Sequence, residues 1–240
     1  MKVFITGSSD GLGQLAARDL IKQGHQVVFH ARNDERGKYA LSKVPGAEKV
    51  LIGDLSSIKE TKQLASEVNA LGEFDAVIHN AGINRASGKE VLNVNCLAPY
   101  ILTSLIKKPK RLIYLGSGMH RGGRADLKNF SSGIGYSDSK LYVLMFSMAV
   151  ARKWSEVYSN TVNPGWVATK MGGSSAPDDL QKGVDTQVWL AVSEDANAKV
   201  SGKYFFHKQE TQFNSQAADL DLQDQLLKIC EKLTGIQFPD

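Results

Sequence analysis

The chain has 240 residues, of which 42% are hydrophobic, and its formal net charge is +4. A chain of this length can bury a sizeable core, and its hydrophobic content is that of an ordinary soluble globular protein. The mild charge argues against a nucleic-acid reader, in which Lys and Arg cluster more densely on one face. No apolar run has transmembrane length, so membrane insertion is not expected, and no internal repeat is present.

The cysteines and histidines predict neither a disulfide framework nor a metal site. Cys96 and Cys230 are the two cysteines, and reduced thiols in a cytoplasmic protein are the simplest interpretation. The five histidines are scattered without ligand spacing, so no metal is expected. The N-terminal apolar run is too short for a signal peptide.

The N-terminal segment combines a short apolar run with closely spaced glycines. Residues Lys2–Thr6 predict a buried first strand, and the apolar spacing after Gly13 predicts a helix that ends near Gly24. A glycine-rich turn between a strand and a helix is the context of a phosphate-binding site. In such a turn Gly7 allows the tight bend, Gly11 lets the backbone approach a pyrophosphate, and Gly13 lets helix and strand pack closely. This segment therefore predicts a dinucleotide site.

The second strand is predicted at Gln26–His30, and Ala31 and Arg32 follow it at the corner next to the expected adenosine ribose. A carboxylate at this corner would bind a ribose 2′-hydroxyl and repel a 2′-phosphate, so an arginine there favours NADP(H), with NAD(H) as the alternative. Asp10 in the glycine loop weakens this preference because it adds negative charge near the same phosphate. A solvated surface arginine is the competing interpretation of Arg32.

Strands and helices continue to alternate along the chain, which predicts a doubly wound parallel sheet of about seven strands with helices on both faces. Ser56 or Ser57 is expected to cap the helix predicted at Ile58–Leu71. The further strands are predicted at Lys49–Ile52, Phe74–His79, Lys110–Leu115, Asn160–Asn163 and Gly202–Phe206, and the further helices at Ile58–Leu71, Tyr136–Tyr158 and 217–235.

Tyr136 and Lys140 stand four residues apart on one predicted helix. This spacing places the phenol and the ammonium on one face, about 6 Å apart along the axis. A phenol is a poor proton donor near neutral pH, and a neighbouring cation favours its ionised form. The pair therefore suits proton transfer, although an amphipathic face with a snorkelling lysine would look the same.

The segment from Trp166 to Asp179 is rich in Gly, Ser and Ala. It suits either a mobile lid over a site or a plain surface loop. Large apolar residues nearby would favour a lipophilic substrate if they lined a pocket. They are Met119, Phe130, Trp166 and Met171.

Several motifs in one order resemble the short-chain dehydrogenase/reductase family over nearly the whole chain. They are T-G-S-S-D-G-L-G from Thr6 to Gly13, N-A-G from Asn80 to Gly82, Asn95, Ser117, Y-S-D-S-K from Tyr136 to Lys140, and P-G at Pro164 and Gly165. The stretches around Ser117, Tyr136 and Asn163 look most like the retinol-dehydrogenase-like and daunorubicin-ketoreductase-like branches. The resemblance implies one α/β Rossmann-fold domain over residues 1–240.

The resemblance also implies roles for four side chains. Tyr136 would donate the proton to a carbonyl oxygen or accept it from an alcohol, and Lys140 would stabilise the phenolate and bind the nicotinamide ribose. Ser117 would hydrogen-bond the substrate oxygen, and Asn95 would hold a water that links Lys140 to solvent. Singly, these residues have plain alternatives, such as a buried helix asparagine at 95 or a turn serine at 117.

A dinucleotide would lie across the carboxyl ends of the strands. Asp54 and Leu55 would contact the adenine, although Asp54 could instead cap the next helix. The full set of residues implied to bind the cofactor is Gly7, Ser8, Ser9, Gly11, Leu12, Gly13, Arg32, Asp54, Leu55, Asn80, Ala81, Gly82, Tyr136, Lys140, Pro164, Gly165, Val167 and Thr169.

Four departures from the family pattern lie near this site. The stretch from Gly82 to Asn95 is shorter by about one to two helical turns, and the segment from Asn95 to Ser117 is also trimmed. Helices of this region commonly build the family's dimer interface, so a homo-oligomer is left open. The Ser117 to Tyr136 interval is longer than usual and is expected to shape the substrate pocket. His79, which replaces the first Asn of the usual N-N-A-G, is interpreted as structural.

The sequence thus predicts an NAD(P)-dependent oxidoreductase that acts on a small-molecule carbonyl or alcohol substrate. Two other hypotheses use the same fold. A nucleotide-sensing regulatory protein would bind the dinucleotide without turnover, but such proteins usually lose the Tyr/Lys pair. A sugar-nucleotide epimerase or dehydratase would carry a larger C-terminal substrate domain than this chain has.

Overall fold

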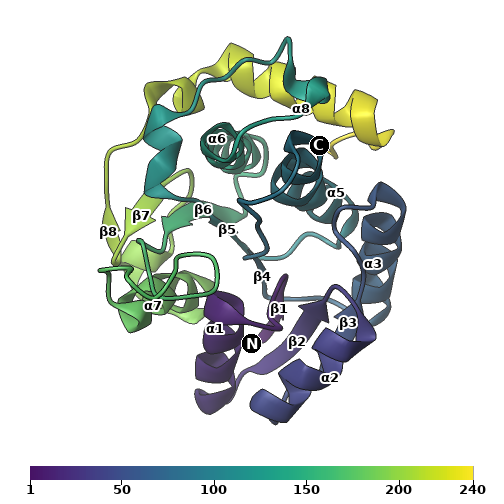
Figure 1. Ribbon diagram of the computed structural model, residues 1–240, viewed down its shortest axis with the longest axis vertical. Helices are drawn as coiled ribbons and strands as arrows, with labels where there is room; N and C mark the ends of the chain where they lie inside the picture. Colours follow the sequence, from purple (N-terminus) through teal and green to yellow (C-terminus); the bar gives the residue numbers. More distant parts are fainter. Residues whose placement is uncertain (240) are drawn as a thin grey trace.

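A single eight-stranded sheet forms the centre of the computed structural model, which describes residues 1–239 (Figure 1). Its strand order is β3-β2-β1-β4-β5-β6-β7-β8. Strands β1 to β7 are parallel, whereas β8 runs antiparallel to β7. The strands are β1 Lys2–Ile5, β2 Gln26–Ala31, β3 Lys49–Ile52, β4 Ala76–His79, β5 Arg111–Leu115, β6 Tyr158–Asn163, β7 Tyr204–Phe206 and β8 Gln209–Glu210. The predicted α/β class and its parallel sheet are confirmed.

Helices cover both faces of the sheet, as the alternation predicts (Figure 1). One face carries α1 (Gly11–Lys22), α2 (Asp34–Lys43) and α7 (Leu180–Val192). The other carries α3 (Ile58–Ala70), α5 (Ala98–Leu105) and α6 (Tyr136–Lys153), with the short α4 (Gly88–Leu92) beside them. Helix α8 (Leu220–Thr234) packs on the outer side of α6.

The first strand explains why its sequence is an unbroken apolar run. Phe4 packs into the core on the side of α3, α5 and α6, while Val3 and Ile5 pack into the core on the side of α1 and α7. Side chains alternate between the two faces of a strand, so a strand that is covered on both faces has no solvent side and needs no polar positions.

Two predicted helix boundaries are corrected by the structure. Helix α6 ends at Lys153, not near Tyr158, because Trp154 turns into the core and Tyr158 already pairs with Arg111 of β5. The C-terminal helix starts at Leu220 with Asp219 as its cap, since residues Ser215–Ala218 form a separate 3-10 turn. The predicted start of α3 holds, and Ser57 is its cap.

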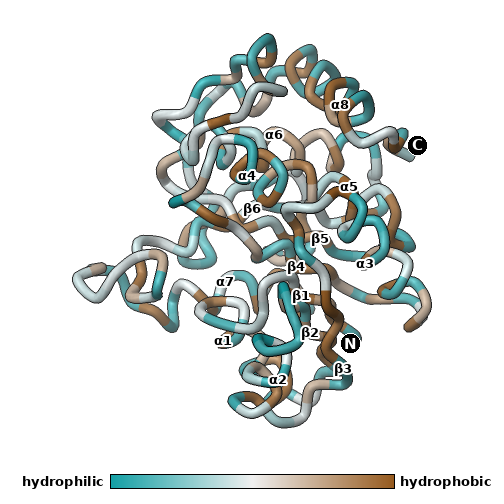
Figure 2. The backbone as a smooth tube through the Cα atoms, turned by 45° about the vertical axis from the view of Figure 1, so that its right-hand side comes forward, coloured by the Kyte–Doolittle hydropathy of each residue, from teal (hydrophilic) through white to brown (hydrophobic). Residues whose placement is uncertain are grey.

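The C-terminal segment covers α5 and α6. The Tyr100 hydroxyl donates to the Ile236 carbonyl at 2.8 Å, and Trp154 Nε1 donates to the Pro239 carbonyl at 3.0 Å. The Phe238 ring stacks on Trp154 with centroids 4.9 Å apart. Helix α8 alternates hydrophobic and hydrophilic turns in Figure 2, and its apolar side faces α6. The chain therefore buries the outer side of its own central helix.

We expect Phe238→Ala to lower the free energy of unfolding by about 3 kcal/mol, because it empties a buried aromatic site between Trp154, Tyr100 and Phe146. Urea denaturation measures this change. The control is Leu220→Ala at the start of α8, where the side chain is 57% exposed and the change should stay within about 0.5 kcal/mol. Equal effects of the two substitutions would contradict the conclusion that the C-terminal segment stabilises the protein by covering α5 and α6.

Two strands carry buried histidines near the centre of the sheet. His79 of β4 stacks on Tyr114 at 4.7 Å, and its Nε2 lies 3.1 Å from the Thr103 hydroxyl, which agrees with a structural role. Burial lowers the pKa of His79 to about 3. Burial also lowers the pKa of His30, on β2, to about 4, although the hydrogen bond to the Gly53 carbonyl acts in the opposite direction. Both rings are therefore neutral near pH 7.

The neutral histidines predict a pH dependence of stability. Above pH 6.5 they are neutral in both the folded and the unfolded chain. Between pH 6.5 and 4 these histidines bind protons in the unfolded chain but stay neutral in the folded chain. The free energy of unfolding therefore falls as the pH falls. His30 alone should contribute about 3 kcal/mol over this window. Urea titrations of wild type and His30→Gln should show a shallower pH slope in the variant, and identical slopes would refute the prediction.

Candidate functional site

The predicted site residues gather at the carboxyl ends of the parallel strands. The sheet order reverses between β1 and β4, because the chain proceeds from β1 outward to β3 and then returns to β4 on the other side. Crevices at such a reversal point are where open α/β sheets bind ligands. The glycine loop follows β1, the Asn80-Ala81-Gly82 turn follows β4, Ser117 follows β5 and Pro164 follows β6.

The glycine loop depends on close backbone packing. Gly7 and Gly11 have φ values of +63° and +55°, which side-chain-bearing residues rarely adopt. A Cβ placed on Gly13 would lie 2.3 Å from Nδ2 of Asn80 and 2.7 Å from the Gly7 carbonyl oxygen. Asn80 donates hydrogen bonds to the carbonyls of Thr6 and Gly7 at 2.9 and 3.1 Å. Asn80 therefore holds the loop that opens at the N-terminus of α1.

His30 also holds the glycine loop, although no sequence motif singles it out. Its Nδ1 accepts from the Gly7 amide at 3.0 Å, and its Nε2 donates to the Gly53 carbonyl at 2.8 Å. Ser8 is fully buried, and its hydroxyl donates to the Ile5 carbonyl and accepts from the His30 amide. The Ser8 hydroxyl therefore makes its hydrogen bonds within the protein. A polar residue inside an apolar strand was the one signal in the sequence for His30.

Two arginines stand near the end of β2. Arg32 is exposed directly after the strand, as predicted. Arg36, on the first turn of α2, was missed: its Nε donates to the Ser9 hydroxyl at 3.3 Å and its guanidinium lies 3.7 Å from the Asp10 carboxylate. Asp10 caps α1 by accepting from the Gly11 amide at 2.8 Å.

Asp10 is also paired with Lys170, which lies on the segment after β6. Burial alone would raise the pKa of the Asp10 carboxyl, but the bonds from Lys170 and the Gly11 amide, with the charge of Arg36, hold it below its usual value. One carboxylate therefore faces two cations here. The negative charge that weakened the prediction of a phosphate site is neutralised by its neighbours.

The predicted adenine corner contains one polar and one apolar residue. Asp54 Oδ1 accepts from the Ser56 amide, and the Asp54 amide donates to Glu60 of α3, both at 2.9 Å. Leu55 is buried in the core. Asp54 thus shapes the turn before α3 but, contrary to its alternative interpretation, does not cap that helix, because Ser57 is the cap.

Tyr136 and Lys140 lie on the first turns of α6. Lys140 is only 4% exposed; its Nζ donates to the Leu115 carbonyl at 2.6 Å and lies 5.6 Å from the centre of the Tyr136 ring. A Cβ placed on Gly82 would be 3.3 Å from Lys140 Nζ and 3.5 Å from Asn95 Oδ1. The structure therefore brings Tyr136, Lys140, Asn95 and the N-A-G turn together.

Asn95 lies in a π-helical turn, Asn93–Leu97, that joins α4 to α5. Its Oδ1 accepts from the Ile83 amide, and its Nδ2 donates to the Ile83 carbonyl and the Ser139 hydroxyl, each at 2.9 Å. The wide turn thus presents Asn95 to both the β4 loop and α6, despite the short connection that precedes it. Such π-turns inside helices often occur at functional sites.

Ser117 lies opposite the start of α6. Its hydroxyl oxygen accepts from the Met119 amide at 3.2 Å, which leaves the hydroxyl hydrogen free to donate to a ligand. The turn after Ser117 is docked on α6, because the Arg124 amide donates to Asp138 at 2.9 Å and a Cβ on Gly123 would lie 2.6 Å from the Ser137 carbonyl. Ser117 and Tyr136 therefore belong to two segments that are held against each other.

The segment after β6 runs from Asn163 to α7 and passes over the glycine loop (green in Figure 1). Thr169 lies 3.8 Å from a Cβ placed on Gly11, and Met171 Sδ lies 4.0 Å from the Tyr136 hydroxyl. Gly165 turns with φ +82°, and its amide donates to the Asn163 side chain at 3.0 Å. This segment, expected as a lid or a surface loop, spans from the cofactor loop to Tyr136.

Leu12 and Val167 complete the contact between the glycine loop and this segment. A Cβ placed on Gly183 of α7 would lie 2.6 Å from the Pro164 carbonyl, 3.0 Å from Val167 and 3.6 Å from Leu12. Because residue 183 is a glycine, α7 can pack closely against both Leu12 and Val167.

Three exposed apolar side chains lie on the segments that flank the site: Met171, whose Sδ is 4.0 Å from the Tyr136 hydroxyl, Met119, two residues after Ser117, and Trp166, on the segment after β6. Met119 and Trp166 are each 57% exposed, and Met171 is 39% exposed. Phe130 was expected among them, but it is wholly buried and packs edge-on against Tyr142 at 4.8 Å. The prediction for Phe130 is wrong because its 3-10 turn points the ring into the core.

Within residues 1–239, no group of three or more His, Cys, Asp or Glu side chains is arranged to hold a metal ion. Cys96 and Cys230 are both buried free thiols. No helix in the described part of the chain combines the length and apolar character needed to cross a membrane.

Several known proteins are similar to this chain in sequence. Residues 1–180 match the family model described as short chain dehydrogenase. An uncharacterized oxidoreductase of Emericella nidulans is 43% identical over 252 residues, covering 100% of this chain and 99% of the relative. The short-chain dehydrogenase chyC of Penicillium rubens is 40% identical over 256 residues, covering 99% of each. Retinol dehydrogenase 13 of Mus musculus is 26% identical, with 98% of this chain and 84% of the relative covered. The likeness to the retinol-dehydrogenase branch is thus the weaker one.

Solved structures agree on the fold. A Mycobacterium paratuberculosis protein superposes with a TM-score of 0.84 at 22% identity, covering 100% of this chain and 95% of that one. RhlG of Pseudomonas aeruginosa, described as an NADP active-site complex, superposes with a TM-score of 0.70 at 20% identity, covering 86% and 96%. With the family model and the fungal relatives, these findings identify the chain as a member of the short-chain dehydrogenase/reductase family of NAD(P)-dependent oxidoreductases.

Proposed function

We propose that the protein is an NADP(H)-preferring carbonyl reductase or alcohol dehydrogenase in which Tyr136 moves the proton. The observation that carries this proposal is the buried Lys140 ammonium one helical turn from Tyr136, between the N-A-G turn and Asn95. A single domain over residues 1–240 and a cytosolic setting belong to the same proposal.

The residues of the site fit a dinucleotide. A Cβ at Gly7 or Gly13 would lie 3.0 Å from Ala81 or 2.3 Å from Asn80, and this tight loop leads directly into the N-terminus of α1, which suits a pyrophosphate. Lys140 has three donor hydrogens and one bonded acceptor among the described residues, so it can also bind ribose hydroxyls. In this proposal the cofactor is held by Gly7, Ser8, Ser9, Gly11, Leu12, Gly13, Arg32, Asp54, Leu55, Asn80, Ala81, Gly82, Tyr136, Lys140, Pro164, Gly165, Val167 and Thr169, to which Arg36 is added.

When bound, the nicotinamide ring supplies or accepts the hydride. Tyr136 gives its phenolic proton to the carbonyl oxygen in reduction and takes the proton from the alcohol in oxidation. Lys140 stabilises the phenolate that remains, because a cation one turn away favours the ionised form of a phenol. Ser117 donates its hydroxyl hydrogen to the substrate oxygen, since the Met119 amide occupies its acceptor side. Asn95 ties α6 to the β4 loop and is proposed to help hold the water that links Lys140 to solvent.

A preference for NADP(H) is supported by the charge near the end of β2. Arg32 and Arg36 flank the place where the adenosine ribose lies in this fold, and the Asp10 carboxylate is paired with Arg36 and Lys170. Two structural neighbours have NADP(H) bound, RhlG and a blue fluorescent protein from a metagenomic library in complex with NADPH. A 2′-phosphate would replace part of the Asp10 contact with Arg36 and bind the planar guanidinium groups.

A lipophilic substrate is supported by Met171, which lies 4.0 Å from the Tyr136 hydroxyl, and by the exposed Met119 and Trp166 on the segments that follow Ser117 and β6. Apolar side chains this exposed gain free energy when a ligand covers them. Screening aldehydes, quinones, cyclic ketones and polycyclic carbonyl compounds with NADPH and NADH identifies the substrate class.

Tyr136→Phe should lower kcat by about 10²- to 10⁴-fold, because the general acid is lost while the ring that packs in the site remains. The Kd for NADPH should stay within about twofold. Initial rates on a substrate from the screen, with a fluorescence titration of NADPH, measure both. Tyr39→Phe on exposed α2 is the control and should change neither. Substantial turnover by Tyr136→Phe would overturn the mechanism.

Arg32→Ala and Arg36→Ala should each weaken NADPH binding about tenfold and leave NADH binding nearly unchanged, because each removes a charge-assisted bond to the 2′-phosphate. Parallel fluorescence titrations with the two nucleotides give the ratio of Kd values. Equal affinities for NADH and NADPH that neither substitution alters would refute the preference.

A further inference from the structure

His120 joins Ser117 to the C-terminal part of the chain. It lies on the 3-10 helix Gly118–Gly122, and its side chain is wholly buried. Its Nδ1 is 2.7 Å from the Ser117 carbonyl oxygen, and its Nε2 is 3.2 Å from the amide nitrogen of Asn214. The ring packs against Tyr204 of β7 at 4.6 Å.

The two partners define the protonation state of the ring. The Asn214 amide can only donate and the Ser117 carbonyl can only accept, so the ring is neutral with its hydrogen on Nδ1. Burial lowers the pKa of His120, and the nearby positive charge of Arg121 lowers it further. The hydrogen bond to the Ser117 carbonyl acts in the opposite direction and raises the pKa. The Ser117 carbonyl accepts a second bond from the His120 amide at 3.2 Å. Ser117 is therefore held twice by one residue.

Further bonds connect the same two segments. Arg121 donates to the Gln212 carbonyl at 3.1 Å, and the Asn214 side chain donates to the Gly123 carbonyl at 3.1 Å. The Ala125 amide donates to Gln216 at 3.3 Å. On its opposite side the turn contacts the start of α6, which carries Tyr136. The turn after Ser117 thus lies between the proton-transferring helix and residues 212–216.

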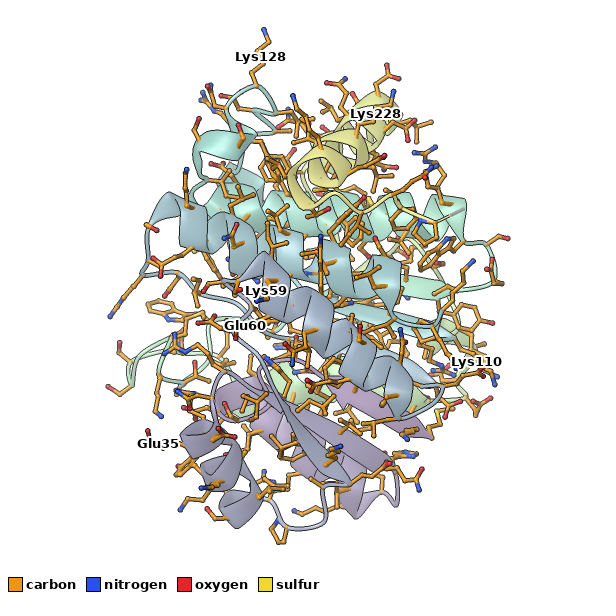
Figure 3. The ribbon with its side chains drawn as sticks, turned by 90° about the vertical axis from the view of Figure 1, so that its right-hand side faces the viewer. Glu35, Lys59, Glu60, Lys110, Lys128 and Lys228 are labelled. Carbon is orange, nitrogen blue, oxygen red and sulfur yellow. The ribbon has the colours of Figure 1, made fainter. Side chains whose placement is uncertain are left out.

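This arrangement occupies the unusually long interval before Tyr136. The interval and α8 meet at one end of the molecule, where Lys128 and Lys228 point outward in Figure 3. The bonds described above join the long interval to residues 212–216, just before α8, so the interval is anchored rather than free.

We propose that His120 is a positioning residue, which fixes Ser117 relative to Tyr136 and uses residues 212–216 as its anchor. The inference rests on the proposed function, in which Ser117 donates to the substrate oxygen. A donor must be placed within a fraction of an ångström to stabilise a developing charge, and a shift of about 1 Å can cost about 100-fold in rate. Without the ring, the Ser117 carbonyl keeps only a backbone bond, and the Asn214 amide loses its acceptor.

The first test compares His120→Leu, which removes both ring bonds, with His120→Gln, which keeps one donor and one acceptor. Leu should lower kcat about 10- to 100-fold, whereas Gln should recover most of the loss. The Kd for NADPH should not change in either variant, because the glycine loop lies on other strands. His25→Gln, at a partly exposed histidine near the N-terminus, is the control and should behave as wild type.

The second test leaves His120 in place and removes its partner. Asn214 has φ −65°, which proline adopts without strain, so Asn214→Pro replaces the amide hydrogen that faces His120 with the ring Cδ, in addition to the loss of the side chain. Asn214→Ala loses the same side chain and keeps the amide. The difference in kcat between the two variants therefore measures the bond to His120, and Pro should be the slower by about tenfold or more.

Wild-type kcat in His120→Leu, or equal kcat in Asn214→Pro and Asn214→Ala, would overturn the inference. It would also be overturned if His120→Leu weakened NADPH binding as strongly as turnover, since that result indicates general loss of structure. Tyr136→Phe is assayed in parallel. If Tyr136→Phe stays active, the proposed function fails; if it is inactive while the His120 and Asn214 variants match their controls, only the role of His120 fails.

Discussion

The burial of the Lys140 ammonium is the constraint on which the rest of the site depends. An ammonium group is costly to bury unless acceptors surround it. No carboxylate pairs with Lys140 in the part of the chain that the structure describes, and the Leu115 carbonyl is its bonded partner. The remaining hydrogens face the site, where Gly82 leaves space and Asn95 approaches. The protein therefore keeps an incompletely satisfied cation at the ends of β4 and β5, and in the proposed function the hydroxyl oxygens of a ligand complete its hydrogen bonds.

Such a cation can be kept in place only by a helix that is itself firmly packed. Residues 139–150 of α6 are all buried, against β5 and β6 on one side and α5 and α8 on the others. The C-terminal segment contributes at both ends of this helix. Its last residues pack on Trp154 near the end of α6, while Asn214 bonds the turn that docks on the first residues of α6. Residues far apart in the chain thus stabilise the one helix that carries Tyr136 and Lys140.

The parts that the sequence predicts well are those with local causes. The apolar run of β1 and the glycine spacing after it are both visible within about a dozen residues, because strand burial and tight turns act locally. The end of α6 was misplaced because Tyr158 continues an apolar pattern, and only its pairing with Arg111 of β5 decides that it belongs to a strand. The contacts of His30 and Arg36 with the glycine loop cross 23 and 27 residues. No local pattern reports such contacts, which is why these residues were not predicted.

His30 and His120 show how the loops at both ends of the site are held by the same chemistry. Each ring accepts from one backbone amide and donates to one backbone carbonyl, and each joins two segments that are distant in sequence. Only a neutral imidazole can do both, so neither ring can take up a proton without breaking a loop contact. Histidine is the usual proton carrier near pH 7, but here both rings are committed to structure. In the proposed mechanism, proton transfer at the substrate oxygen therefore falls to Tyr136, whose phenol requires the buried Lys140 cation beside it.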